Sequence, residues 1–171
     1  MHVDGTEKKW IILSFAMAFA MMGILTAYAL NKNIHPPSNV EVIDSTTLHL
    51  SDEFNEDNLG IKKEDDGSLR ITMVAARYGF FPHNMTVPVD TPIKIRIASA
   101  DVLHGVHTSN TNFNTMIVPG YISEVNTTFR IKGNHPMFCN EYCGLGHDYM
   151  WSQLNVVSQE EFAASFEKGD K

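Results

Sequence analysis

The longest apolar run in the chain extends from Trp10 to Leu30 and contains no charged residue. At about 1.5 Å per residue, a helix of this length crosses a hydrocarbon core of about 30 Å. The alternative is a secretory signal peptide, because two lysines precede the run and Ala27-Tyr28-Ala29 resembles a cleavage site. Signal peptides usually have a shorter apolar region, of about 7 to 15 residues. The pattern therefore favours a retained transmembrane anchor.

The lysines on either side of this run predict its orientation. Lys8 and Lys9 precede the run, and only Lys32 follows it closely. Basic residues concentrate on the cytoplasmic side of a membrane helix. We therefore expect a single-pass protein of the cell membrane with a cytoplasmic N-terminus. The part of the chain after Asn31 is expected on the outer side, which is periplasmic or extracellular.

Beyond the tail and anchor (residues 1–31), the pattern becomes polar from residue 32 to residue 68. This stretch contains Pro36-Pro37 and few apolar residues. Its acidic residues include Asp52, Glu53, Glu56, Asp57, Glu64, Asp65 and Asp66. Such a composition is typical of an exposed linker. We therefore expect an acidic stem between the anchor and a folded domain over residues 69–171.

From Leu69 onward, short β-rich stretches alternate with turn residues. The predicted strands cover residues 69–78, 85–89, 93–98, 121–131 and 150–157. This spacing predicts an all-β sandwich or barrel. Ser158 and Glu161 have the form of a capping box, and Phe162 and Phe166 repeat at helical spacing. A short helix is therefore expected at the C-terminal end.

Composition narrows the possible partners. The formal net charge is -7 and the sequence pI is about 5.5. A chain with this charge is repelled by nucleic acid, and it attracts a basic protein. The chain has two cysteines, Cys139 and Cys143, which are too few for a disulfide-rich scaffold. The pair therefore needs a local explanation.

The stretch from Cys139 to Met150 combines thiol, imidazole and thioether groups. Cys139, Cys143, His147 and Met150 all lie in it, and a further imidazole is available upstream at His104 or His107. Spacing does not choose between these two histidines. Soft sulfur ligands together with imidazole favour copper over magnesium, calcium or manganese. The stretch is therefore a candidate copper loop.

The second cysteine suggests a site with two metals. Both sulfurs could bridge two coppers, each of which would also take one histidine. Met150 would be a weak ligand to one metal, and a backbone carbonyl of the loop, with that of Glu141 as the candidate, would serve the other. A disulfide and a Cys₂His₂ zinc site remain alternatives. Neither of them gives Met150 or Glu141 a role.

The loop resembles the CuA loop of cytochrome c oxidase subunit II. The shared pattern is Cys, three residues, Cys, three residues, His, two residues and Met, with a Glu in the first gap and Gly144 after the second Cys. The resemblance covers about Leu69 to Val157, and the single anchor resembles the B-type oxidases. It implies a cupredoxin-like Greek-key fold and a binuclear CuA centre. The implied copper ligands are His104, Cys139, Glu141 (through its carbonyl oxygen), Cys143, His147 and Met150.

The resemblance also implies a function and partners. The chain would receive electrons from cytochrome c or a cupredoxin and pass them to subunit I, which bears heme and CuB. Tyr78, Phe80 and Phe81 resemble an aromatic patch near the point where electrons arrive, although ordinary packing explains them equally well. His107 and Asp101 would lie behind the ligands. The sequence itself shows no acid-base catalytic site. The alternative is a stand-alone, membrane-anchored cupredoxin that carries electrons or delivers copper.

Overall fold

The computed structural model describes residues 4–31 and 38–166, and its first element is a long helix. Helix α1 (Gly5–Asn31) buries none of its residues. The Asp4 carboxylate caps it by accepting hydrogen bonds from the backbone N–H groups of Thr6 and Glu7, at 2.6 and 3.0 Å. Among the described residues it is the one helix long and apolar enough to span a membrane. The predicted apolar helix is therefore confirmed.

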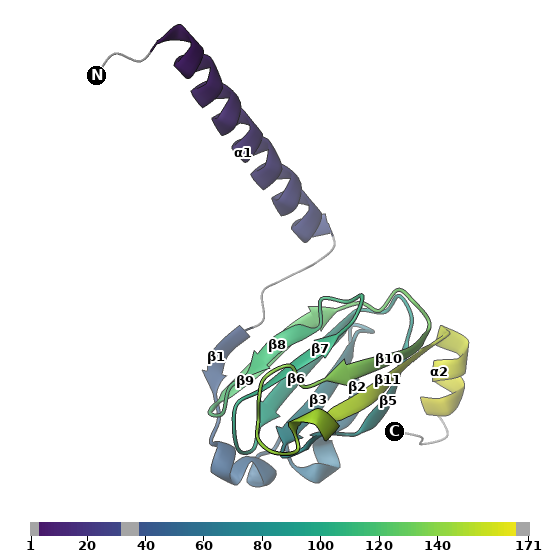
Figure 1. Ribbon diagram of the computed structural model, residues 1–171. Helices are drawn as coiled ribbons and strands as arrows, with labels where there is room; N and C mark the ends of the chain where they lie inside the picture. The colour runs from purple at the N-terminus through teal and green to yellow at the C-terminus, as the bar shows by residue number, and fades with distance from the viewer. Residues whose placement is uncertain (1–3, 32–37, 167–171) are drawn as a thin grey trace. The chain divides into compact units, whose positions relative to one another are not determined.

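The remaining described residues form a β-sandwich (Figure 1). Its strands are β1 (Ser38–Val42), β2 (Gly60–Lys63), β3 (Leu69–Ala76), β4 (Gly79–Phe81), β5 (Asn84–Pro88), β6 (Ile93–Ser99), β7 (His104–Thr108), β8 (Asn114–Ile117), β9 (Tyr121–Thr127), β10 (Gly133–Phe138) and β11 (Trp151–Val157). The first sheet has the order β1-β9-β6-β3-β2, and β4 also pairs with β3. The second sheet has the order β5-β11-β10-β7-β8. The predicted all-β class is confirmed.

Five strands agree with those predicted from the sequence. These are β3, β5, β6, β9 and β11, and their ends differ from the predicted ends by a few residues. The strand β9 is the largest difference, because it ends at Thr127 rather than at residue 131. The strands β3 and β6 are parallel, as are β5 and β11, whereas the other pairs are antiparallel. Parallel neighbours require crossover connections, and these link the two sheets.

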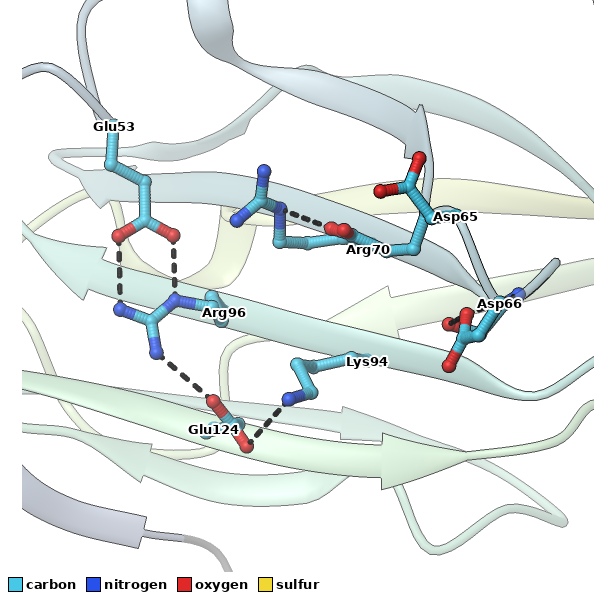
Figure 2. Close-up of a pocket in the computed structure, with 9 residues that line it drawn as sticks. Glu53, Asp65, Asp66, Arg70, Lys94, Arg96 and Glu124 are labelled. Carbon is cyan, nitrogen blue, oxygen red and sulfur yellow. Dashed lines mark hydrogen bonds and ion pairs between the residues drawn. The ribbon is translucent and has the colours of Figure 1, made fainter.

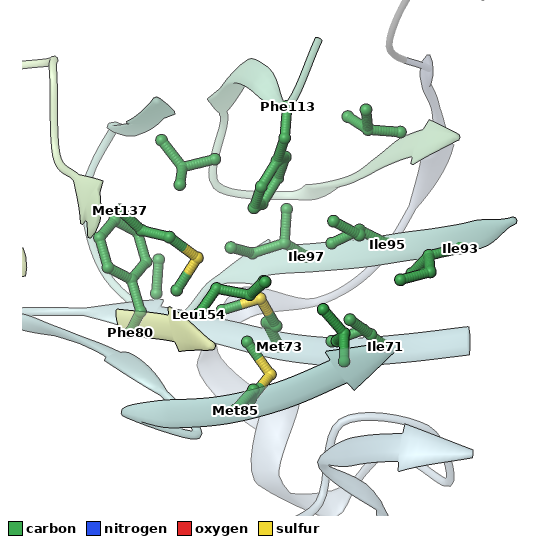
Figure 3. Packing of buried hydrophobic residues seen from close by; sticks show 14 of the residues in the cluster. Ile71, Met73, Phe80, Met85, Ile93, Ile95, Ile97, Phe113, Met137 and Leu154 are labelled. Carbon is green, nitrogen blue, oxygen red and sulfur yellow. The ribbon is translucent and has the colours of Figure 1, made fainter. Parts of the chain in front are cut away.

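The main core lies between the two sheets (Figure 3). Ile71 and Met73 of β3, Ile95 and Ile97 of β6, and Leu154 of β11 are all fully buried. These residues follow the two-residue period of a strand, so one face of each strand points into the core. This packing fixes the central strands, and these strands in turn fix the positions of the loops that connect them at the ends of the sandwich.

The predicted exposed stem over residues 32–68 is not what the described residues show. Strand β1 pairs with β9, and β2 pairs with β3, so both belong to the first sheet. Between them, Leu48 and Phe54 are buried against Ala98 and Ile122 in a second, smaller core. Residues 32–37 lie outside the described residues. The segment from residue 38 to residue 63 is therefore an integral part of the sandwich.

Two acidic residues of this segment, Glu41 and Glu53, belong to an ion-pair network around Arg96, part of which is drawn in Figure 2. Arg96, on the outer face of β6, donates to both carboxylate oxygens of Glu53, at 2.6 and 2.9 Å. It also pairs with Glu41 and Glu124, each at 2.9 Å. Bidentate arginine-carboxylate contacts are among the stronger ion pairs. Glu41 and Glu53 thus hold the segment against the sheet, although its acidic composition resembles that of a linker.

Helix α2 (Gln159–Phe166) follows β11, as the sequence predicts. The backbone N–H of Ser158 donates to a Glu161 carboxylate oxygen at 3.0 Å, and the backbone N–H of Glu161 donates to the Ser158 hydroxyl at 3.2 Å. This reciprocal pair is a capping box. The rings of Phe162 and Phe166 lie 5.3 Å apart by their centroids. The predicted helix and its capping residues are confirmed.

Candidate metal centre

The candidate centre is built where β7, β10 and β11 meet at one end of the second sheet. Strand β10 pairs with β7 and with β11, so Phe138 is opposite both His107 and Trp151. The loop between β10 and β11 contains the short helix η3 (His147–Tyr149). The backbone N–H of Cys139 donates to the Met150 carbonyl at 3.1 Å and closes the loop at its base. The upstream histidine and the loop are thereby brought together.

The two cysteines lie side by side in the loop and are not bonded to each other. Their Sγ atoms are 3.9 Å apart, whereas a disulfide has a sulfur-sulfur distance of about 2.05 Å. Both side chains are buried. The Glu141 carbonyl oxygen lies 3.2 Å from Cys139 Sγ. The structure therefore has two free thiols at a separation that leaves room for metal between them.

One imidazole lies beside each thiol. Nδ1 of His104 is 3.9 Å from Cys139 Sγ, and Nδ1 of His147 is 3.6 Å from Cys143 Sγ. Met150 Sδ is also 3.6 Å from Cys143 Sγ. All six residues proposed as ligands are thus brought together. His104, Cys139 and Cys143 form a compact group whose ligand atoms all lie within 4.8 Å of one another, and His147 is not part of that group. The arrangement is therefore elongated.

His104 and His107 differ in the face of β7 that they occupy. Residues three apart on a strand point to opposite faces. His104 is completely buried together with Val106 and Thr108, whereas His107 is only partly buried. Of the two, the structure therefore places His104 at the thiols.

Asp101 holds the His104 ring in place. Its Oδ1 atom lies 2.8 Å from Nε2 of His104. Burial opposes ionisation of Asp101, but hydrogen bonds from His104 and from the backbone N–H groups of Val102 and Arg77 outweigh burial and lower its pKa. A carboxylate at this position accepts a hydrogen bond from Nε2–H of His104. The unprotonated Nδ1, with its lone pair, then faces Cys139. This is the orientation that a metal ligand requires.

The surroundings of Cys143 oppose loss of its thiol proton. Burial, and after it the neighbouring Cys139 thiol, raises the pKa of Cys143 to about 11. A metal that binds the Cys143 thiolate must therefore displace this proton.

The three aromatic residues predicted near the site occupy different environments. Phe80 is fully buried in the main core, so it cannot contribute to an exposed patch. Tyr78 and Phe81 are exposed. Tyr78 also lies against the loop at Gly144 and Gly146. The sequence did not indicate the contact of Tyr78 with this loop. The spacing of residues within one segment does not show which distant segment of the chain lies against them.

A second aromatic contact within the loop was also not predicted. The Tyr142 ring lies 5.8 Å from the His147 ring, measured between centroids, at an interplanar angle of 58°. Tyr142 is largely exposed. Its position directly before Cys143 was the only sequence signal that placed it near the site.

Comparison with known proteins identifies the family. Residues 53–157 match the family model described as cytochrome c oxidase subunit II, periplasmic domain. The chain belongs to this family. Cytochrome c oxidase subunit 2 of Thermus thermophilus is 31% identical over 153 residues, which cover 88% of this chain and 90% of that protein.

Two solved structures have the same fold. A chain of a heme-copper terminal oxidase dimer superposes with a TM-score of 0.68 at 24% identity and covers 89% of this chain and 99% of its own. The periplasmic domain of subunit II from Bradyrhizobium japonicum gives a TM-score of 0.54 at 22% identity and covers 63% and 94%. The predicted cupredoxin-like fold is thereby confirmed. As a subunit II, the chain is part of a heme-copper oxidase, an oxidoreductase, and its apolar helix fits a single-pass membrane protein.

Proposed function

We propose that the thiol and imidazole cluster holds a binuclear copper centre of the CuA type. The observation that carries the proposal is the order of the donor atoms. His104 Nδ1, Cys139 Sγ, Cys143 Sγ and His147 Nδ1 follow one another in steps of 3.9, 3.9 and 3.6 Å. If two metals shared the thiolates of Cys139 and Cys143, His104 would be available to one metal and His147 to the other. One tetrahedral zinc would need all four donors close together, and His147 lies outside the compact group.

Copper suits the complete donor set. Thiolate and thioether are soft ligands, and imidazole also binds copper well. The Met150 thioether and the Glu141 carbonyl supply a further weak donor for each of two metals. Two coppers held by these residues would supply one-electron transfer. The protein contributes by burying the thiols, by separating the two imidazoles and by fixing the His104 ring through Asp101.

The proposed partners follow from the anchor and from the charge. With the N-terminus in the cytoplasm, the sandwich lies on the outer side of the cell membrane, where a soluble cytochrome c or cupredoxin reaches it. The net charge of -7 favours a basic donor. Of the three aromatic residues expected near the point of electron entry, Tyr78 and Phe81 are exposed, and we assign them to the surface on which the donor docks. We assign His147 to the route from copper to heme in subunit I.

Metal content and the paramagnetic spectrum of the full-length chain test the proposal. We expect two coppers per chain and hyperfine coupling to both nuclei in the oxidised form. Replacement Cys143→Ser should abolish the centre or leave a single copper, because a hydroxyl is a hard and poor substitute for a bridging thiolate. A wild-type chain with a single-metal spectrum, or a Cys143→Ser chain with an unchanged spectrum, contradicts a binuclear centre.

A further inference from the structure

The turn between β3 and β4 touches the metal centre from two directions. Its first contact is made by Tyr78, whose ring covers two glycines of the loop. A Cβ atom built on Gly146 would lie 2.7 Å from both Cγ and Cε2 of Tyr78, and one built on Gly144 would lie 2.8 Å from its hydroxyl oxygen. Ordinary Cβ contacts are not closer than 3.0 Å. The absence of side chains at these positions is therefore what lets the ring approach the loop backbone.

The second contact leads to His104. The backbone N–H of Arg77 donates to Oδ2 of Asp101 at 2.9 Å. The other oxygen of the same carboxylate lies 2.8 Å from Nε2 of His104. One carboxylate thus fixes both the turn and the first imidazole. The residue next to Arg77 then extends from this fixed point to the loop that carries Cys143 and His147.

We propose that Tyr78 is a positioning residue for the metal centre, and this role rests on the copper centre proposed above. The loop needs such a restraint because its outer side faces solvent, with Leu145 and Tyr149 exposed. Its glycines also leave the backbone conformationally free, which is costly to order. The Tyr78 ring limits the positions open to the loop. It thereby sets the distance of Cys143 and His147 from Cys139 and His104.

A double-mutant cycle tests this contact directly. Gly146 has a φ of -99° and a ψ of 18°, so its backbone tolerates alanine and the conflict comes from the Tyr78 ring. Gly146→Ala in the full-length chain should lower copper retention and shift the absorption spectrum. In a Tyr78→Ala background, the same change should have little additional effect, because the ring that it meets is gone.

Gly144 provides the matched comparison. Its φ is +131°, so alanine is strained there whether or not the ring is present. Gly144→Ala should therefore remain defective in the Tyr78→Ala background. Additive effects of Gly146→Ala and Tyr78→Ala would overturn the proposal.

Thiol reactivity in the metal-free chain gives a readout that does not depend on copper. Tyr78→Ala should speed modification of Cys143 by a disulfide reagent by roughly tenfold, because a loop released from the ring opens more often. Tyr78→Phe keeps the ring and should react as the wild type does. Tyr121→Ala is the control, because Tyr121 is 41% exposed, close to the 39% of Tyr78. Unchanged thiol rates in Tyr78→Ala would overturn the role of Tyr78, whereas a wild type without paired coppers would overturn only the proposed centre.

Discussion

The two histidines of the candidate centre lie in opposite surroundings. His104 begins a strand of the second sheet, has no exposed surface and is hydrogen-bonded to Asp101. His147 begins a short helix in a loop, is only partly buried and has the exposed Tyr142 ring beside it. A buried polar group needs a fixed partner, and a group at the surface does not. The two halves of the centre are therefore held by different means.

This difference suggests a division of roles. A strand in a paired sheet moves less than a loop that is open to solvent on one side. The His104 side is therefore suited to retaining metal. The His147 side is suited to exchanging electrons with another protein, because its imidazole lies close to the surface. The following variants test that division from the largest expected effect to the smallest.

Removal of His104 should have the largest effect. His104→Ala eliminates one imidazole and leaves the Asp101 carboxylate without the ring beside it. We expect loss of the paired-copper spectrum and of most bound copper. Metal analysis and the absorption spectrum of the full-length chain provide the measurement.

His107→Ala is the matched control on the same strand. Because His107 points to the other face of β7, the variant should keep both coppers and change only stability or reduction potential. If His107→Ala instead lost the metal and His104→Ala kept it, the ligand assignment would move to His107. The metal-retaining role assigned to the His104 side would then be wrong.

A change at Asp101 should have an intermediate effect. Oδ1 accepts from His104 and Val102, and Oδ2 accepts from Arg77. In Asp101→Asn the amide NH2 group faces a donor on either side, so the variant loses either the bond from Arg77 or the two bonds from His104 and Val102. Residues that hydrogen-bond a ligating histidine typically contribute about 10- to 100-fold in metal affinity. We expect a loss of this size in copper titrations of the metal-free chain.

Asp148→Asn is the corresponding change on the other side. Asp148 is adjacent to His147 and exposed, so the variant alters net charge by the same amount. Its copper affinity should remain close to that of the wild type. Equal losses in the two variants would show that charge rather than the hydrogen bond to His104 is responsible, and the contrast between the two sides would disappear.

Most of the candidate ligands could be predicted from the sequence because they are concentrated in one short motif. The spacing of Cys139, Cys143, His147 and Met150 is enough to indicate copper. The choice of His104 over His107 came from the family resemblance, and the structure adds a physical reason in the strand face. The contact of Tyr78 with Gly146 could not be predicted, because it joins segments that are far apart in the chain.

The fold was less evident where packing overrides composition. Arg96 attracts Glu41 and Glu53 onto the sheet, yet acidic residues in a sequence are more typical of an exposed linker. Met116 is the reverse case, because it is an apolar residue of a β-rich region and yet is exposed on β8, where Thr115 and Ile117 are buried instead. Short strands such as β7 and β8 carry too few residues for a clear alternating pattern.

The smallest effect is expected at Tyr142, on the exposed side of the centre. Tyr142→Ala removes the ring beside His147, and an exposed substitution of this kind usually changes stability by no more than about 0.5 kcal/mol. Copper content and spectrum should stay unchanged, while electron transfer from copper to heme in the purified oxidase should slow. Tyr149→Ala is the control, because Tyr149 is 76% exposed, close to the 73% of Tyr142, and has no ring contact with His147 among the described residues. Flash-induced kinetics resolve reduction of copper by the donor from its oxidation by heme. If Tyr142→Ala slows only the first step, electrons arrive through His147 rather than leave through it, and the route assigned to this histidine is reversed.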